Sequence, residues 1–310
     1  MNAVHPAEED SPSPALSIKP ERLRLRFTPL APLRLPSFSG SLLRGVFGHA
    51  LRQIACSCGA DIHQPDCRYN VIFEPPEAKD SKIAGLHTPP PAYVLTPPAP
   101  GEQQIHPGQT VSFDLTLLGP AVAEQGLILG AWRLALRRGL GLPAVPCELL
   151  GADSIPLNSV AGTEAIELVF TSPWHIKRRG KNLRPEDFTL RELLFALARR
   201  STVVQQSWPL PFMVPASDEL ARLSEQLHSE INVKNVRWER YSNRQQKSMP
   251  LYGLMGSVRI WAPSPEKLDP ILPLLTWGQW LHGGSKTALG LGGYLLQDAV
   301  NPSKAANAEH

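Results

Sequence analysis

The segment Ala165-Ile-Glu-Leu-Val-Phe170 predicts a strand with which the second half of the chain begins. A capping-box pattern, Thr189-Leu-Arg-Glu192, then predicts the start of a helix. Further strands are expected around residues 233–241 and 251–261, a helix around 268–280 and a last strand at 294–297. Strand, helix, two strands, helix, strand is the order of a ferredoxin-like domain, so we expect that fold for the second half.

The first half begins with a similar strand-like segment. Arg22-Leu-Arg-Leu-Arg-Phe27 alternates strictly, which puts its leucines and Phe27 on one face of a sheet and its arginines on the other. Helices are predicted over 41–54 and 126–138, a strand over 110–118 and a loop over 147–163. We therefore expect an α+β protein of two tandem ferredoxin-like (RRM-like) domains, residues 18–150 and 151–300, between disordered tails at 1–17 and 301–310.

Composition limits the class of protein. The chain has 310 residues, and its 31 Lys and Arg exceed its 28 Asp and Glu by three, so a site for a polyanion must be local. No stretch approaches the roughly 20 apolar residues that a membrane span needs. The acidic, Ser/Pro-rich residues 1–14 lack the features of a signal peptide. We therefore expect a cytoplasmic protein with reduced cysteines and no membrane partner.

The predicted helix over 41–54 carries a polar face. At 3.6 residues per turn, Gly45, Gly48, His49 and Arg52 fall together, away from the apolar stripe. Glycine weakens a helix by roughly 1 kcal/mol relative to alanine, so the close approach of a backbone or a phosphate would explain the two glycines. From the residues alone, a structural histidine at a helix edge is the simpler interpretation of His49.

Cations gather in one loop of the second half. Lys177, Arg178, Arg179, Lys181 and Arg184 lie close together in sequence, beside Trp174, whose ring is suited to stacking on a base. Solvated charge is the alternative interpretation of this loop. The arginines of the segment 22–27 fit a solvated sheet face as well as an RNA-facing one.

A glycine-rich segment connects the last predicted helix to the last strand. Five of the eleven residues from Gly283 to Gly293 are glycine. Such a segment exposes backbone N–H groups to anions, and a tight turn is an equally good interpretation. The glycine spacing does not fit a Walker loop, and Leu295 stands where a dinucleotide fingerprint needs its third glycine. No ATP, NAD or other cofactor is therefore expected.

Four parts of the chain together carry a resemblance to a known family. They are Leu43-Arg-Gly-Val-Phe-Gly-His-Ala-Leu-Arg52 with Phe73-Glu-Pro75, Val169-Phe-Thr-Ser-Pro-Trp-His-Ile-Lys-Arg-Arg-Gly180, Trp238-Glu-Arg-Tyr-Ser-Asn-Arg-Gln245 with residues 253–258, and Leu281-His-Gly-Gly-Ser-Lys-Thr-Ala-Leu-Gly-Leu-Gly-Gly-Tyr294. In this order they resemble segments of the CRISPR-associated repeat-RNA processing endoribonucleases, members of the RAMP superfamily. The similarity spans about residues 20–298.

The resemblance implies RNA cleavage without a metal, by attack of the 2′-OH on the adjacent phosphate, to leave a 2′,3′-cyclic phosphate. His49 matches the family's helix-borne histidine, and Arg52 would hold the phosphate. Tyr69, Tyr93 and Lys286 are candidates for the partner of that histidine. CRISPR repeat RNA or crRNA and other Cas effector subunits are the implied partners. A non-cleaving crRNA-binding subunit is the alternative, and the unusual region 182–213 suggests a type IV system as one hypothesis.

The resemblance also implies a set of RNA contacts, mostly cations and glycine backbone. The set is Arg22, Arg24, Arg44, Lys177, Arg178, Arg179, Lys181, Arg184, Arg244, His282, Gly283, Gly284, Lys286, Gly290 and Gly292. Arg244 is equally consistent with bracing a hairpin. We expect such a spread of contacts because RNA stems are recognised largely through their shape, phosphates and 2′-OH groups.

Three cysteines and a histidine raise the question of zinc. Cys56-Ser-Cys58, His63 and Cys67 offer thiolates and an imidazole, which are its usual ligands. Their spacing does not match a zinc ribbon or finger. Separate core thiols and no metal are therefore the expectation, and a structural zinc ion is the alternative.

Overall fold

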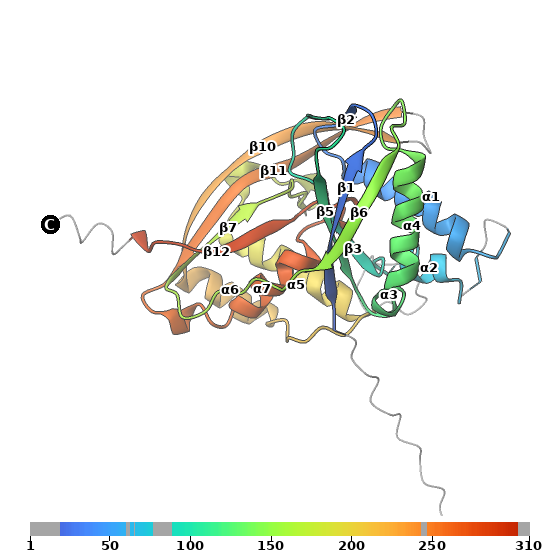
Figure 1. Ribbon diagram of the computed structural model, residues 1–310. Coiled ribbons are helices and arrows are strands. Elements are labelled where there is room, and N and C mark those ends of the chain that lie inside the picture. The colour runs from blue at the N-terminus through green and yellow to red at the C-terminus, as the bar shows by residue number, and fades with distance from the viewer. Residues whose placement is uncertain (1–18, 60–62, 65, 77–88, 243–246, 303–310) are drawn as a thin grey trace, which may run out of the picture.

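The computed structural model describes residues 19–59, 63–64, 66–76, 89–242 and 247–302. These residues form helices packed on antiparallel sheets, so the expected α+β class is confirmed (Figure 1). Among them, no helix is long and apolar enough to cross a bilayer. Residues 1–17 and 303–310, expected as tails, lie outside the described part. Asn301 is buried and donates to the carbonyl of Ala262 at 3.2 Å, so the packed fold continues past the expected start of the second tail.

The first half forms a four-stranded sheet in the order β3-β5-β1-β6, with antiparallel neighbours throughout. Its elements are β1 (Glu21–Pro29), β2 (Leu33–Leu35), α1 (Gly40–Ala55), α2 (Arg68–Phe73), β3 (Tyr93–Thr96), β4 (Gln103–Ile105), β5 (Val111–Leu117), α3 (Pro120–Ala123), α4 (Gln125–Arg138) and β6 (Cys147–Ser154). The short strands β2 and β4 pair separately. The two helices and two strands predicted for this half are thus confirmed.

The apolar stripe of α1 and the apolar face of β1 share one core. Leu43, Phe47 and Leu51 of α1 are fully buried, and Leu25 of β1 belongs to the same cluster. Phe47 stacks on Trp132 of α4, with ring centroids 4.8 Å apart. Because the stripe must face this core, the packing fixes the rotation of α1 about its axis. It therefore also fixes the direction in which the polar face of α1 points.

The prediction of a loop over residues 147–163 is wrong for residues 147–154, which form the strand β6. β6 pairs with β1 from Pro29↔Cys147 to Leu23↔Ser154, with a shift of register between Arg26 and Phe27. Gly151 and Asp153 within β6 are residue types that strands disfavour, and β6 is an edge strand, so its pattern did not predict a strand. The domain boundary expected at 150/151 falls inside β6, and the first half extends to Ser154.

The second half repeats the arrangement with a sheet in the order β10-β11-β7-β12. Its elements are β7 (Ala165–Phe170), β8 (Lys177–Arg178), β9 (Lys181–Asn182), α5 (Leu190–Gln205), α6 (Ser217–Gln226), β10 (His228–Ser242), β11 (Lys247–Trp261), α7 (Leu272–Leu281) and β12 (Tyr294–Asp298), with 3-10 turns at Pro185–Asp187, Pro265–Lys267 and Thr287–Leu289. Thr189 caps α5 as predicted, since its hydroxyl accepts from the N–H of Glu192 at 3.3 Å. The long β10–β11 hairpin, orange in Figure 1, reaches back over the first half near β2.

Candidate functional site

A groove lies between the two halves, along the polar face of α1. It has a volume of about 580 Å³. Five parts of the chain line it, namely β2, α1, the segment just before β4, the segment after α4, and β10. The lining residues include Arg34, Ser41, Gly45, His49, Glu102, Gly141, Leu142, Trp238 and Glu239. These elements are distant in sequence, so only the folded chain brings the groove together.

His49 lines this groove from α1. Its side chain is exposed. Gly45, one turn earlier, lies beside an open space, because a Cβ atom there would meet no atom within 4 Å. Gly48 differs from the expectation, since a Cβ atom there would overlap the ring of Phe73 in α2. Gly45 therefore opens the groove beside His49, whereas Gly48 lets α2 pack closely against α1.

A cation faces the same groove from β2. The side chain of Arg34 is 77% exposed, and its Nη2 lies 2.7 Å from Oε2 of Glu102. The hydrogen bond to Glu102 raises the pKa of Arg34. Sequence analysis missed Arg34. The available signal was the alternation of Leu33-Arg-Leu35, which buries both leucines and leaves the arginine outside.

The partners expected for His49 lie elsewhere. Arg52 is exposed but does not line the groove, and its charge acts on the hydroxyl group of Tyr69. Tyr69 is buried and donates to Glu74 at 3.2 Å, and burial followed by the Glu74 charge raises its pKa to about 12. Tyr93 is fully buried, and burial raises its pKa as well. Neither tyrosine is placed to exchange a proton with a ligand in the groove.

The glycine-rich segment is a tight turn, and its N–H groups do not form an open phosphate cradle. Gly283 donates to the carbonyl of Gly292 at 2.9 Å, Gly292 to that of Pro173 at 2.9 Å, and Gly290 to that of Thr287 at 2.8 Å. All three glycines are buried. The expectation that they contact RNA is therefore wrong, because their donors are already used inside the protein.

Two further residues of this segment are more accessible. Gly284 is half-buried, and a Cβ atom there would lie 2.8 Å from the carbonyl oxygen of His175. Lys286 is exposed, with a left-handed backbone at φ 63°. It does not line the groove of His49. Lys286 thus remains a candidate RNA contact, while Gly284 is held by close packing.

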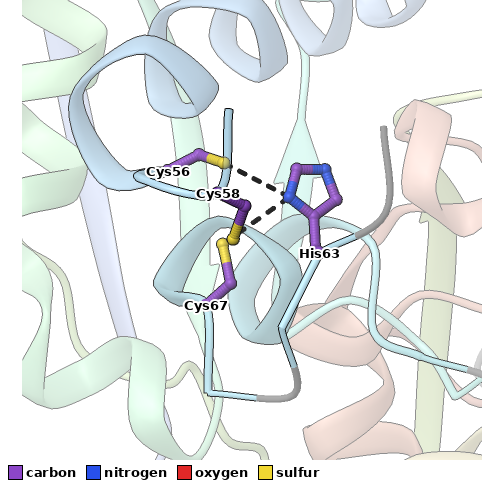
Figure 2. Close-up of side chains that lie close together, drawn as sticks. All are labelled: Cys56, Cys58, His63 and Cys67. Atoms are coloured by element: carbon purple, nitrogen blue, oxygen red, sulfur yellow. Dashed lines mark hydrogen bonds between the residues drawn. The ribbon is translucent and has the colours of Figure 1, made fainter. Parts of the chain in front are cut away.

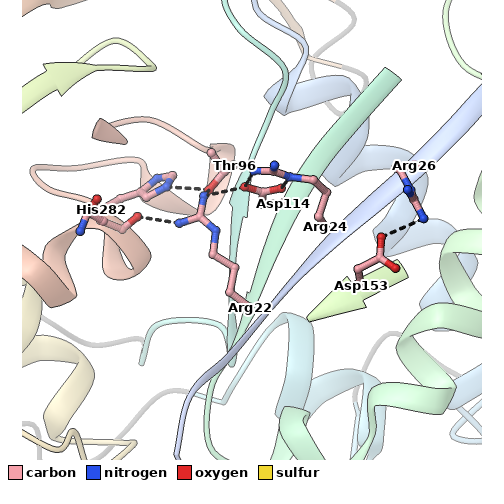
Figure 3. A network of polar contacts seen from close by, with 8 residues as sticks. Arg22, Arg24, Arg26, Thr96, Asp114, Asp153 and His282 are labelled. Atoms are coloured by element: carbon pink, nitrogen blue, oxygen red, sulfur yellow. Dashed lines mark hydrogen bonds and ion pairs between the residues drawn. The ribbon is translucent and has the colours of Figure 1, made fainter. Parts of the chain in front are cut away.

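His282, expected as an RNA contact, is fully buried between the two halves (Figure 3). Its Nδ1 lies 3.0 Å from the carbonyl oxygen of Leu291, and its Nε2 lies 2.9 Å from Oγ1 of Thr96 in β3. Burial, followed by the charge of Arg22, lowers the pKa of His282 to about 3. The ring is therefore neutral at pH 7, so Nδ1 donates to Leu291 and Nε2 accepts from Thr96. The expected RNA contact is wrong, because no part of the ring reaches solvent.

Arg22 and Arg24 converge on the carboxylate of Asp114 (Figure 3). Arg22 lies 3.0 Å from Oδ2, and Arg24 donates twice, at 2.8 and 3.0 Å. Arg22 also donates to the carbonyl of Gln279 in α7 at 2.9 Å, and its side chain is only 9% exposed. The RNA contact expected of Arg22 is therefore wrong, because its charge is neutralised where the halves meet. Arg24 is half exposed, but Asp114 holds its guanidinium.

Arg44 and Trp174 also have structural roles. The guanidinium of Arg44 lies over the ring of Phe73, 4.5 Å from its centroid. Trp174 is fully buried and stacks on Phe170 with centroids 4.8 Å apart. The stacking of Trp174 on an RNA base is thus a wrong expectation. Arg244 lies outside the described residues.

The basic loop forms the short hairpin β8–β9 on the surface. Four of its five cations, Lys177, Arg178, Arg179 and Lys181, belong to the exposed run 177–182. The fifth, Arg184, pairs with Glu186 at 3.1 Å and with Asp187 at 3.0 Å. Arg178 pairs with Glu192 at 3.4 Å. Lys177, Arg179 and Lys181 therefore give the hairpin its outward positive charge. Lys177 also borders a second cavity of about 680 Å³ between this hairpin, α5 and the glycine-rich segment.

The cysteines near α1 are not separate core thiols. Cys56, Cys58 and Cys67 gather around His63 at the ends of α1 and α2 (Figure 2). Only Cys67 of these four residues is buried. Cys147, by contrast, lies in β6, and its thiol donates to the carbonyl of Val145 at 3.3 Å. The fold thus brings together a set of potential ligands that sequence spacing did not indicate.

Two family models match the chain. Residues 18–170 match AF_1859_N, described as an N-terminal domain, and residues 168–294 match CRISPR_Cas6, described as CRISPR-associated endoribonuclease Cas6. No curated protein sequence matches significantly.

Solved structures with the same fold cover nearly the whole chain. A Thermus thermophilus Cas6 product complex matches with a TM-score of 0.55 and 18% identity, over 89% of this chain and 99% of that one. A RAMP protein binding different RNA substrates matches at 0.53 and 14%, over 90% and 100%. A partial Cas6-RT-Cas1–Cas2 complex matches at 0.56 and 13%, over 91% and 46%. Residues 168–294 are therefore similar to the CRISPR-associated endoribonuclease Cas6, and the chain as a whole shares the fold of solved Cas6 and RAMP structures.

Proposed function

We propose that this chain binds CRISPR repeat RNA and cuts it to mature crRNA, as an endoribonuclease that needs no catalytic metal. The observation that carries the proposal is the exposed imidazole of His49 in a groove between the halves, with the cation Arg34 in the same groove. The Cas6 family match of residues 168–294 supports repeat RNA as the substrate. The product remains bound and then joins other Cas subunits.

The proposed reaction leaves a 2′,3′-cyclic phosphate and a 5′-OH. The 2′ oxygen attacks the adjacent phosphorus, and the bond from phosphorus to the 5′ oxygen of the next nucleotide breaks. The imidazole of His49 takes the proton of the attacking 2′-OH or supplies one to the leaving 5′ oxygen, because a ring nitrogen of histidine can act as a general base or a general acid. Water carries the other proton, so the 2′-OH loses one proton and the leaving 5′ oxygen gains one. Because the 2′ oxygen of the RNA itself is the nucleophile, no metal-bound hydroxide is required.

Arg34 is the proposed phosphate-binding cation. The negative charge that builds on the phosphate in the transition state needs a nearby positive group. A guanidinium has five N–H donors, so Arg34 can bind a phosphate oxygen while it is paired with Glu102. Arg52, outside the groove, is the alternative. The variants Arg34→Ala and Arg52→Ala separate the two, because only the cation at the phosphate should lower the single-turnover rate.

The hairpin β8–β9 is the proposed surface for the rest of the repeat. Lys177, Arg179 and Lys181 are exposed there, and Lys286 is exposed on the neighbouring glycine-rich segment. Phosphate contacts from spread cations suit an RNA stem, which is recognised by shape and backbone. Such contacts also fit retention of the product, because cleavage leaves most phosphates of the repeat unchanged.

We also infer that both halves are ferredoxin-like units. When only the four-stranded sheet and the helices α1 and α4, or α5 and α7, are counted, each half has the element order strand, helix, two strands, helix, strand. If the four strands of each sheet are numbered by their order along the chain, they lie side by side in the order 2-3-1-4 in both sheets. This order supports the inference, because the first and third strands lie at the centre and the crossover helices cover one face.

The test is cleavage of labelled cognate repeat RNA in EDTA, with wild type compared with His49→Ala. We expect the variant to lose roughly 10²- to 10⁴-fold in single-turnover rate and to bind RNA as before. His228→Ala is the matched control, since His228 is also exposed but lies at the start of β10, outside the groove. The 3′ end of the product should resist ligation until the cyclic phosphate is removed.

Each outcome decides between functions. Tight binding by wild type without cleavage would replace the nuclease by a crRNA-binding subunit. Cleavage that His49→Ala leaves unchanged would keep the nuclease and remove His49 from its chemistry. Cleavage that stops in EDTA and returns with Mg²⁺ would contradict the metal-independent mechanism.

A further inference from the structure

We propose that Cys56, Cys58, His63 and Cys67 form a structural zinc site. This inference goes beyond the proposed RNA cleavage and does not depend on it. One ligand atom from each of the four residues lies within 4.8 Å of all the others. The Nδ1 of His63 is 3.2 Å from Sγ of Cys56 and 3.7 Å from Sγ of Cys67. In Figure 2 the four side chains point toward one another.

These distances fit a tetrahedral ion. Zn–S bonds of about 2.3 Å and Zn–N bonds of about 2.0 Å hold neighbouring ligand atoms roughly 3.5 to 3.8 Å apart. The observed upper limit of 4.8 Å leaves only small side-chain shifts to be made. Hydrogen bonding alone explains the cluster poorly, because a thiol is a weak donor and a weak acceptor.

The donor set selects the metal and the role. Thiolate and imidazole ligands suit zinc, whereas Mg²⁺ and Ca²⁺ prefer oxygen ligands, and iron–sulfur clusters are usually held by four cysteines. Three cysteines and a histidine fill all positions of a tetrahedron, so no position remains for a reactive water. None of the four residues lines the groove of His49. The ion is therefore structural and takes no part in RNA cleavage.

The site connects the end of α1 to the start of α2. Cys56 is the C-cap residue of α1, and Cys67 is the N-cap residue of α2. The helix α2 has six residues and no side-chain hydrogen bond at its N-cap, and so short a helix is not stable by itself. A bound ion would hold α2, and with it Phe73, against Gly48 of the helix that carries His49.

Metal content is the first test. The full chain is produced without a histidine tag, purified under reducing conditions and analysed by mass spectrometry of its elements. We expect about one zinc ion per chain, as for other sites of this ligand set. Cys58→Ser and His63→Ala should lose most of the zinc. Cys147→Ser is the matched control and should keep it, because Cys147 lies in β6, outside the cluster.

Two measurements on wild type avoid dependence on the folding of the variants. Replacement of zinc by Co²⁺ should give the visible absorption bands of a tetrahedral, thiolate-bound cobalt ion. Removal of zinc by a strong chelator should lower the melting temperature by at least about 5 °C, because the ion binds only the folded site. Zinc added back should restore it.

Metal-free wild type that takes up no cobalt would overturn the proposal, as would a zinc content that Cys58→Ser leaves unchanged. Titration of the four thiols in denaturant, on protein purified without reductant, identifies a rival, since fewer than four would show a disulfide. None of these readouts involves RNA. Failure of the zinc site therefore leaves the nuclease proposal standing, and a zinc-loaded chain that cuts no RNA contradicts only the nuclease proposal.

Discussion

The groove along α1 and the turn after α7 contain the same kinds of residue in opposite settings. Each has a histidine close to glycines. In α1, His49 is exposed and Gly45 adjoins open space. After α7, His282 is fully buried, and Gly292 donates its N–H to Pro173. The comparison teaches that glycine forms a site for a ligand only where the fold leaves the space beside it unfilled.

The cause of the difference is the position of each segment relative to the two halves. The turn after α7 is packed between them, since His282 bonds Thr96 of β3, and a Cβ atom at Gly290 would lie 2.9 Å from the carbonyl oxygen of Leu95. The polar face of α1 instead lies along the groove between the halves, which no side chain of the described residues fills. The turn after α7 therefore joins the two halves, whereas the polar face of α1 lines the space between them.

The largest effect on stability is expected when one glycine of each segment, Gly292 in the turn after α7 and Gly45 in α1, is replaced by alanine. Gly292→Ala should lower the free energy of unfolding by about 3 kcal/mol, because φ is +81° and the new Cβ would overlap the carbonyl oxygen of Gly283. Gly45→Ala should raise it by up to about 1 kcal/mol, since its helical position has room. Urea unfolding measures both. Equal stability of the two variants would contradict the close packing of the turn.

Acid should weaken the turn. The pKa of His282 is about 3 in the folded protein, below its ordinary value of 6.5, so the unfolded chain binds the proton more readily between these values. The stability contributed by the neutral ring is therefore complete above pH 6.5 and is lost as the pH falls toward 3. Between pH 7 and 5 the loss should be about 2 kcal/mol.

The variant His282→Asn sharpens this expectation. Asparagine can still donate to the carbonyl of Leu291 but does not titrate. The slope of unfolding free energy against pH should therefore fall by about one proton in this window. His175, whose pKa burial and the charges of Lys286 and Lys177 lower to about 4, keeps part of the slope. An unchanged slope in the variant would mean that His282 does not titrate as described.

Much of the fold follows from local patterns, and the parts that do not follow have physical reasons. The apolar periodicity of α1 and the alternation of β7 predicted their bounds closely. The helix α6 was missed because it is short and mostly polar, with Leu220 and Leu223 its buried residues. The strand β3 was missed because it has four residues and follows a Pro-rich region.

The site was predictable only where a single element decides exposure. His49 follows from the helical periodicity of α1, because the buried stripe determines the opposite face. The partner of Arg22 is Asp114, far away in sequence, so no local pattern shows that this arginine is neutralised. Arg34 of β2 shares its groove with Trp238 of β10, about 200 positions later in the chain, so no local pattern shows that this arginine lines a groove. Contacts between residues far apart in the sequence, and not composition, therefore determine which of these arginines faces a possible ligand.

A smaller effect, on the affinity for RNA, is expected when the exposed cations of the hairpin β8–β9 are removed. Replacing Lys177, Arg179 and Lys181 together by alanine should weaken repeat RNA binding roughly tenfold at low salt. The slope of log affinity against log salt should fall by about 2 to 3, as expected for the loss of three phosphate contacts. Filter binding across a salt series measures both quantities.

The control for the hairpin removes as many exposed cations elsewhere, at Arg133, Arg222 and Lys267. This triple variant should bind nearly as wild type does, apart from weak long-range effects that salt removes. Equal losses in the two variants would show that net charge alone drives binding. The hairpin would then not be the RNA surface.

The central claim is that His49 acts on RNA whereas His282 holds the halves together, and one paired measurement tests it. His49→Ala and His282→Asn are each assayed for single-turnover cleavage of repeat RNA and for urea unfolding, at pH 7 and at a temperature where both are folded. We expect His49→Ala to lose cleavage with unchanged stability, and His282→Asn to lose stability with cleavage nearly unchanged. Loss of cleavage in His282→Asn alone, with His49→Ala fully active, would contradict this account.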